Sequence, residues 1–228
     1  YIIFCMEKNI FTNAANTIEY FIQGDNPNLL IISGIHGDEF EVVESVRKSI
    51  EKNKDKLGDF VYIPIASPTA FEARNRQSAC GLDMNRHFTN SCKCNEAQAI
   101  MQLLKSMKIK QCVSFHEDLE HPHFYMYDSD NMEGDECLAR LRKDITELGV
   151  DLLNDVDDKD DEHLGFEFID GYAGNIPDAE GKPIGSMETW LIKEKITDRV
   201  FCIEVPGSSS KDIKDKLVEK VLYNLVIC

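Results

Sequence analysis

The chain alternates short apolar runs with longer segments in which apolar residues recur every three or four positions. The short runs predict buried strands, which fall at residues 18–22, 29–32, 60–65, 111–115 and 199–205. The longer segments predict amphipathic helices, which fall at residues 38–52, 96–107, 136–148 and 211–226. This alternation favours an α/β fold, with a mixed, mostly parallel central sheet and helices on both of its faces.

No internal repeat and no low-complexity linker divides the sequence. Its 228 residues are enough to enclose one large hydrophobic core, so we expect residues 1–228 to form a single domain. The strongly acidic stretch at residues 155–162 is expected to be a solvated loop. It does not fit a calcium-binding loop, because Asp160 stands at the sixth position, where such a loop needs glycine.

The balance of charge narrows the possible partners. The chain has 41 Asp and Glu against 25 Lys and Arg, which gives a formal net charge of -16. Proteins that bind nucleic acid or anionic lipid need basic surface, so this charge argues against both. No apolar run approaches the ~18 residues of a membrane-spanning helix, and no signal peptide is visible. We expect a cytoplasmic protein with no nucleic-acid or membrane partner, and the sequence leaves its oligomeric state open.

The chain contains 8 cysteines. Cys5, Cys112 and Cys202 lie inside apolar runs, where a thiol packs as a small hydrophobic group. A chain of this size does not depend on a disulfide framework, which favours a reducing compartment, and the sequence leaves the redox state of the cysteines open. A structural zinc site built from residues 92–94 and 121–123 is an alternative. Its C-x-C spacing is tighter than zinc sites usually have, which favours ordinary thiols and loop histidines.

Three predicted strands end in residues that can bind a metal ion or move a proton. His36 and Glu39 follow the strand at 29–32 within the sequence Gly-Ile-His-Gly-Asp-Glu. An imidazole and a carboxylate three residues apart can bind one zinc ion, and the glycines allow a sharp turn. A catalytic zinc needs a third protein ligand, and His116 is the best candidate. The residues alone leave open whether His116 is instead an ordinary histidine at a strand end.

A loop at residues 76–86 and the end of the last strand hold the remaining candidates. Arg76, Asn85 and Arg86 can bind a substrate carboxylate through charge-assisted hydrogen bonds, and one arginine could polarise a carbonyl group. An ordinary surface loop would also accommodate these residues. Glu204 ends an apolar strand, where burial would raise the pKa of its carboxyl group and suit a general base. Pairing with a lysine or arginine is the alternative for Glu204.

In order and local context, these residues resemble the zinc carboxypeptidase family. Residues 76–86 are similar to that family's R-x-N-x-x-G-x-D-x-N-R segment, with Ser78 where asparagine is usual. Residues 185–190 are similar to its Gly-Ser...Trp segment. The sequences at residues 116–118 and 124–127 look most like the short bacterial branch, which includes murein-peptide amidases.

The resemblance implies the fold of a zinc carboxypeptidase and the make-up of a metal centre. His36, Glu39 and His116 would bind one zinc ion per chain, and Asp83 would be the carboxylate that orients His36. A sister group, the aspartoacylases and succinylglutamate desuccinylases, shares the zinc pattern. It has a Glu-Val-Gly-Pro sequence, which is similar to residues 204–207 here.

The resemblance also implies the roles around the metal. Arg76 would stabilise the oxyanion, and Asn85 and Arg86 would hold the substrate carboxylate. Glu204 would act as general base and then as general acid. The expected enzyme is a zinc metallopeptidase of the carboxypeptidase type. It would hydrolyse an amide bond next to a free carboxylate in a peptide or peptide-like small substrate.

Two other functions remain open. An N-acyl-amino-acid deacylase of the aspartoacylase or succinylglutamate desuccinylase type would use the same Asn85 and Arg86. A catalytically inactive binding protein on the same fold would be expected to have lost a ligand or the base, whereas this sequence keeps them all.

One departure from the family bears on substrate choice. Carboxypeptidases of the family often carry a mobile tyrosine in the region that corresponds to residues 178–181, and this chain has none there. Tyr172 lies further back. If Glu180, Glu188 and the acidic loop line the pocket, a substrate with a basic or amine group is expected.

Overall fold

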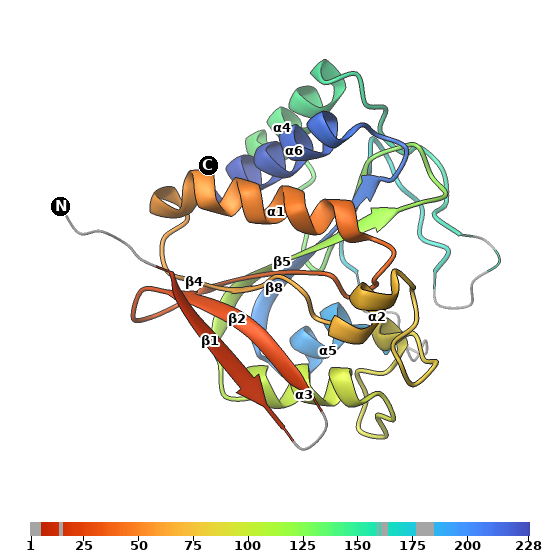
Figure 1. Ribbon diagram of the computed structural model, residues 1–228. Helices are drawn as coiled ribbons and strands as arrows, with labels where there is room; N and C mark the ends of the chain where they lie inside the picture. The colour runs from red at the N-terminus through yellow and green to blue at the C-terminus, as the bar shows by residue number, and fades with distance from the viewer. Residues whose placement is uncertain (1–5, 14–15, 159, 161–163, 177–184) are drawn as a thin grey trace.

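A mixed sheet of eight strands forms the centre of the computed structural model, which describes residues 6–13, 16–158, 160, 164–176 and 185–228 (Figure 1). The strand order is β1-β2-β4-β3-β5-β8-β6-β7. The inner strands β4, β3, β5 and β8 run parallel, whereas β1, β2 and β6 pair antiparallel. The strands are β1 (Glu7–Thr12), β2 (Thr17–Gln23), β3 (Leu29–Ser33), β4 (Phe60–Ile63), β5 (Ile109–Asp118), β6 (Tyr125–Asp128), β7 (Tyr172–Ala173) and β8 (Thr197–Pro206).

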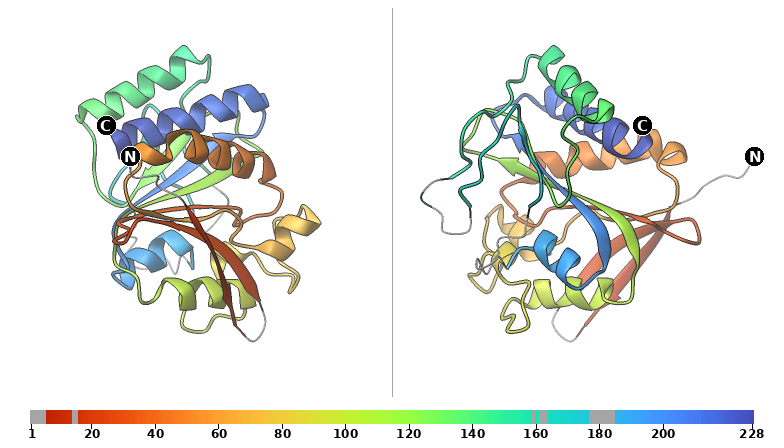
Figure 2. Two further views of the ribbon diagram at one scale, coloured as in Figure 1. Left: turned by 60° about the vertical axis from the view of Figure 1, so that its left-hand side comes forward. Right: turned by 180° about the vertical axis from the view of Figure 1, so that it is seen from behind.

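Helices cover both faces of the sheet (Figures 1 and 2). On one face lie α1 (Phe40–Asn53), α4 (Glu136–Glu147) and α6 (Lys211–Leu222). On the other lie α3 (Asn95–Leu104) and α5 (Met187–Lys193). The remaining helical segments are α2 (Pro68–Ala73), the 3-10 turns η1 (Lys54–Lys56) and η2 (Met84–Arg86), and the π-helical turn η3 (Tyr223–Ile227). The mostly parallel α/β fold predicted from the sequence is therefore confirmed.

Strand β3 shows why its run of apolar residues is continuous. All five of its residues are buried, and successive side chains point to opposite faces. Leu29 and Ile31 pack into the cluster beneath α1 and α6, whereas Leu30 and Ile32 pack into the cluster over α3 and α5. A strand covered on both faces needs apolar residues at every position, because neither face meets water.

The five predicted strands and four predicted helices all exist, with small shifts at their ends. Strand β5 is longer than predicted and continues to Asp118, so His116 lies within the strand rather than after it. The sequence did not predict β1, β6, β7, α2 or α5. Strand β1 lies at the edge of the sheet and is mostly exposed, and the other four elements have seven residues or fewer, too short for a clear periodicity. Within the described part of the chain, no helix is long and apolar enough to span a membrane.

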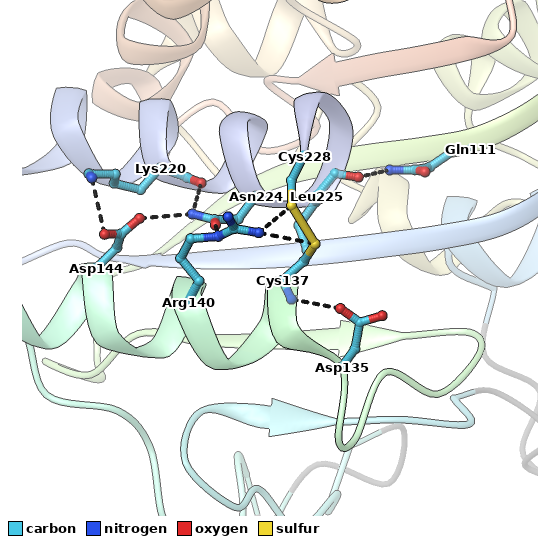
Figure 3. Close-up of a disulfide and its surroundings, with 9 residues drawn as sticks. All are labelled: Gln111, Asp135, Cys137, Arg140, Asp144, Lys220, Asn224, Leu225 and Cys228. Atoms are coloured by element: carbon cyan, nitrogen blue, oxygen red, sulfur yellow. Dashed lines mark hydrogen bonds and ion pairs between the residues drawn. A yellow bond between two sulfur atoms is a disulfide. The ribbon is translucent and has the colours of Figure 1, made fainter.

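A disulfide joins Cys137, at the start of α4, to Cys228 (Figure 3). Nearby, Arg140 donates a hydrogen bond to Asn224 at 2.9 Å, and Asn224 donates to Asp144 at 2.9 Å. The sequence left the redox state of the cysteines open, and the structure pairs these two. The two cysteines are 91 residues apart, and nothing local in the sequence predicts the contact.

Candidate metal centre and active-site pocket

A cavity of about 900 Å³ opens at the carboxyl ends of β3, β5 and β8. Side chains from both ends of the sequence meet there, because the parallel strands all end at this edge of the sheet. Every site residue predicted from the sequence lines this cavity: His36, Glu39, Arg76, Asp83, Asn85, Arg86, His116 and Glu204.

His36, Glu39 and His116 form a tight, buried cluster. Each has one possible ligand atom within 4.8 Å of those of the other two, and none of the three side chains is more than 5% exposed. One carboxylate oxygen of Glu39 contacts Nδ1 of His36, and the other lies 3.1 Å from Nδ1 of His116. Two imidazoles and a carboxylate on one side of a pocket are the ligand set of a catalytic zinc site with an open position.

The turn between β3 and α1 depends on a glycine. A Cβ atom on Gly37 would lie 1.8 Å from the carbonyl oxygen of Ala70, so only glycine fits against the end of α2. The amide of Gly37 also donates to the carbonyl of Asn75 at 2.9 Å. This close approach brings the loop that carries Arg76 next to His36.

Asp83 contacts the second ring nitrogen of His36. Its Oδ1 lies 3.2 Å from Nε2 of His36, and Arg76 Nε donates to Oδ2 at 3.0 Å. Burial alone would raise the pKa of Asp83, but its bond to His36 and the charges of Arg76 and Arg86 hold that pKa well below its usual range. Histidines that bind metals commonly give their other ring nitrogen to a carboxylate in this way.

Glu188 makes the equivalent contact with His116. Its Oε1 lies 3.4 Å from Nε2 of His116, and its Oε2 accepts a hydrogen bond from Nδ2 of Asn85 at 3.2 Å. Burial would raise the pKa of Glu188, but the contact with His116 outweighs this and lowers the pKa to about 2. Sequence reasoning placed Glu188 only among acids that might line the pocket. Its place within the conspicuous segment at residues 185–190 was the available signal.

Glu204 faces the same cavity from β8, where it is the register partner of His116 on β5. Burial raises the pKa of its carboxyl group to about 8, against the opposing effect of His116 and with support from the negative charges of Glu39 and Asp118. No side chain of the described residues donates a hydrogen bond to it or forms an ion pair with it. The alternative of a pairing with lysine or arginine is thus not observed.

The arginines lie beside the cluster. Nη1 of Arg76 is 3.4 Å from Nδ1 of His36 and 3.9 Å from Oε1 of Glu39. Arg86 donates through Nη1 to the backbone carbonyl of Asn85 at 3.2 Å. These groups provide positive charge at the edge of a pocket that is otherwise mostly acidic.

The described part of the acidic stretch is a loop with Asp155, Asp158 and Asp160 exposed, as predicted, but Asp157 departs from the prediction. Asp157 is buried, with 5% of its surface exposed, and it accepts hydrogen bonds from the hydroxyl of Tyr127 and from the amides of Gly165 and Phe166. Asp155, Asp158 and Asp160 line the pocket. The described residues of the stretch therefore form part of the wall of the cavity.

Other candidate residues from the sequence fall outside the site. The hydroxyl of Tyr172 donates to Asp128 at 2.7 Å, and Tyr172 does not line the pocket. Residues 178–181, which include Glu180, lie outside the described residues. His121 is an exception, because it lines the cavity wall, where its ring contacts the backbone carbonyl of Asp157. Cys94 packs in the core beside α3. Among the described residues, no metal-ligand group combines residues 92–94 with residues 121–123.

The sequence also matches a known family of enzymes. Residues 25–143 match the profile of the succinylglutamate desuccinylase/aspartoacylase catalytic domain. The chain therefore belongs to that family, whose members are hydrolases, and its fold is that of the metallo-carboxypeptidases. No curated protein matches the sequence at a significant level.

Three solved structures illustrate the fold. A candidate metallopeptidase of Shewanella amazonensis SB2B has 19% identity and a TM-score of 0.78, over 97% of this chain and 86% of that one. A metallo-carboxypeptidase of Pseudomonas aeruginosa, in complex with (2-guanidinoethylmercapto)succinic acid, has 18% identity and a TM-score of 0.66, over 97% and 64%. An aspartoacylase family protein of Mesorhizobium loti has 17% identity and a TM-score of 0.57, over 97% and 66%.

Proposed function

We propose that this protein is a zinc-dependent hydrolase that cleaves an amide bond next to a free carboxylate in a peptide or peptide-like substrate. The observation that carries the proposal is the buried His36, Glu39 and His116 cluster, with Glu204 facing the same cavity. Residues 1–228 would act as one catalytic domain.

The side chains fit a zinc ion. Zinc accepts nitrogen and oxygen ligands. Asp83 contacts Nε2 of His36 and Glu188 contacts Nε2 of His116, which are the ring nitrogens on the outer side of the cluster. All three candidate ligands line the open cavity. When bound, zinc supplies Lewis-acid polarisation of a carbonyl oxygen and makes a water molecule more acidic.

The chain's own groups would carry the proton and the charge. Glu204 takes a proton from the attacking water and returns it to the leaving nitrogen, which its raised pKa favours. The guanidinium of Arg76 donates hydrogen bonds to the oxygen that becomes negative as the water attacks. Asn85 and Arg86 hold the substrate carboxylate, so that the scissile bond lies against the metal centre.

The acidic wall supports a substrate with a basic group. Asp155, Asp158 and Asp160 line the cavity and would attract an ammonium or guanidinium group. The ligand in the Pseudomonas aeruginosa structure combines a guanidino group with succinic acid. Charge reversal by Asp158→Lys should reduce kcat/KM for basic substrates more than for neutral ones. An unchanged ratio would remove this part of the proposal.

A deacylase is the second candidate, because the family match is to the succinylglutamate desuccinylase/aspartoacylase catalytic domain. Such an enzyme would release acetate or succinate from an acylated amino acid, with the same residues in the same roles. Parallel assays on short peptides and on acetyl- and succinyl-amino acids separate the two candidates.

The decisive experiment measures zinc content and hydrolysis for the wild type, His116→Ala and His123→Ala. His123 is the matched control, since it lies seven residues after His116 on the connection that follows β5 but does not line the pocket. We expect one zinc per chain in the wild type and in His123→Ala, and none in His116→Ala. A wild-type protein that takes up no zinc, or that retains it fully in His116→Ala, would contradict the proposal.

A further inference from the structure

The two histidines of the metal cluster are joined by a closed ring of hydrogen bonds. On the inner side, Glu39 contacts Nδ1 of both His36 and His116. On the outer side, Asp83 contacts Nε2 of His36, and Glu188 contacts Nε2 of His116. Asn85 closes the ring, because its backbone amide donates to Asp83 at 2.8 Å and its side-chain amide donates to Glu188 at 3.2 Å.

The ring determines which nitrogen of each histidine can bind a metal. Both Nδ1 atoms point to Glu39 and to the centre of the cluster. An imidazole that binds a metal through Nδ1 carries its proton on Nε2, and a carboxylate that accepts this proton fixes both the tautomer and the ring orientation. Asp83 is in that position for His36. Glu188 is in that position for His116.

The two outer carboxylates differ in their other partners. Asp83 also accepts a hydrogen bond from the guanidinium of Arg76, which neutralises part of its charge. Within the described part of the chain, Glu188 pairs with no lysine or arginine, and its side chain is 12% exposed. The negative charge of Glu188 therefore acts on His116 with little compensation. This makes the imidazole of His116 more basic and a stronger electron-pair donor to a metal ion.

Asn85 links this support to the substrate. Its Oδ1 accepts a hydrogen bond from the amide of Met187 at 2.8 Å, and one N–H of its side-chain amide is directed at Glu188. Asn85 lines the cavity, and among the described residues its side-chain amide donates only to Glu188, so a second N–H is available for a substrate anion. Gly185 allows the two segments to meet, because a Cβ atom there would lie 2.3 Å from the carbonyl oxygen of Arg86.

We propose that Glu188 is a positioning residue that holds His116 in its metal-binding orientation and, through Asn85, couples this orientation to the group that binds the substrate carboxylate. The inference rests on the proposed function for the metal and the substrate. It assigns Glu188, which sequence reasoning placed only among acids near the pocket, to the support of the metal centre. A substrate bound at Asn85 would then act on the same carboxylate that orients His116.

A competing arrangement shares two of these groups. His116, Glu188 and Cys202 also have possible ligand atoms within 4.8 Å of one another. If they bound a second metal ion, Glu188 would be a ligand and not a positioning residue. The stoichiometry of bound metal separates the two arrangements.

The test compares zinc affinity, measured by competition with a chromogenic chelator, in the wild type, Glu188→Gln, Glu188→Asp and Glu194→Gln. Glu194, the exposed acid at the end of α5, is the matched control. We expect Glu188→Gln to weaken zinc binding by about 10–100-fold, as loss of such outer partners typically does, with partial recovery in Glu188→Asp. Glu194→Gln should match the wild type. Circular dichroism and the Tm check that each variant folds.

Kinetics and stoichiometry complete the test. Glu188→Gln leaves one acceptor oxygen for two donors, Nε2 of His116 and Nδ2 of Asn85. When zinc saturation holds that oxygen on His116, the bond to Asn85 is lost, and the KM for substrates with a free carboxylate should rise. Unchanged zinc affinity in Glu188→Gln overturns the proposal, as do two zinc ions per wild-type chain with one lost in Cys202→Ser. A wild type that binds zinc but hydrolyses neither substrate class defeats the proposed function alone, since the affinity comparison still tests Glu188.

Discussion

His116 and Glu117 are neighbours on β5, yet their side chains lie on opposite faces of the sheet. His116 faces the cavity, where Glu204 lies with no cationic partner among the described residues. Glu117 also lines the rim, but its carboxylate accepts hydrogen bonds from Nζ of Lys214 at 2.5 Å and from the amide of Val42 at 3.2 Å. Lys214 is 1% exposed and bonds Glu41 as well.

The two carboxylates show two ways of burying charge. At Glu117 a lysine from α6 compensates the charge, and the group joins the α1–α6 layer to the sheet. At Glu204 the charge is uncompensated, so its proton is held more strongly and becomes available for transfer. The two groups thus differ in role because, among the described residues, only Glu117 has a compensating cation.

The largest expected effect tests the chemical face. Glu204→Gln removes the proton carrier while keeping the shape of the side chain, so kcat should fall by about 10²–10⁴-fold. Steady-state kinetics on the zinc-loaded protein measure this. The Tm should not fall, since no side chain of the described residues bonds Glu204 and the variant therefore breaks no such contact. A loss of stability with unchanged kcat would reverse the comparison.

For Glu117 and Lys214, on the other face of the sheet, we expect a loss of stability. Lys214→Met leaves Glu117 buried without its cation, and breaking a buried ion pair in this way costs about 3–5 kcal/mol. Urea unfolding measures the loss. The double variant Lys214→Met/Glu117→Leu should recover part of it, because both charges are then gone. If the single variant is as stable as the wild type, the pair does not stabilise the fold.

The pH dependence of stability sharpens the contrast in the metal-free protein. The pKa of Glu204 is raised to about 8, so the folded state prefers its neutral form. Its favourable contribution is present below the unfolded pKa of ~4.3 and is lost as pH rises through the folded value. Glu204→Gln should therefore match the wild type near pH 4 and be more stable near pH 9, in unfolding measured at both values. Parallel curves would contradict the raised pKa.

Asp215, on α6 in the α1–α6 layer, should contribute a smaller pH dependence of stability. Burial would raise the pKa of Asp215, but hydrogen bonds from Lys211, Lys48 and Ser45 outweigh this and lower it to about 2. A lowered pKa stabilises above the unfolded value of ~3.9, and the gain is lost as pH falls through the folded value. Solvent screening limits it to about 1 kcal/mol. Asp215→Asn should remove that part of the acid transition, as followed by circular dichroism, and leave kcat unchanged.

Most of the fold could be predicted because its signals are local. The buried strands and amphipathic helices each show their periodicity within a dozen residues. His36, Glu39, His116 and Glu204 follow from their places at strand ends, since parallel strands bring such ends together.

The parts that could not be predicted depend on contacts distant in the sequence. Glu188 meets His116 because α5 packs against β8, the neighbour of β5 in the sheet. No pattern around residue 188 specifies this contact. Asp157 is buried by bonds to the hydroxyl of Tyr127 and to Gly165 and Phe166, although its neighbours in sequence are charged. Cys137 and Cys228 meet across 91 residues of chain.

Because successive side chains of β5 alternate between the two faces of the sheet, the chemistry depends on whether the strand changes length by an odd or an even number of residues. His116 lies opposite Glu204, and Glu117 lies opposite Val205. Deleting one residue from β5 ahead of His116, with the pairing kept, would present a carboxylate to the metal cluster and turn the imidazole toward Lys214. Deleting two residues would restore the side on which each kind of group lies. Odd and even changes of length in this strand therefore have different consequences, even though the strand remains equally apolar.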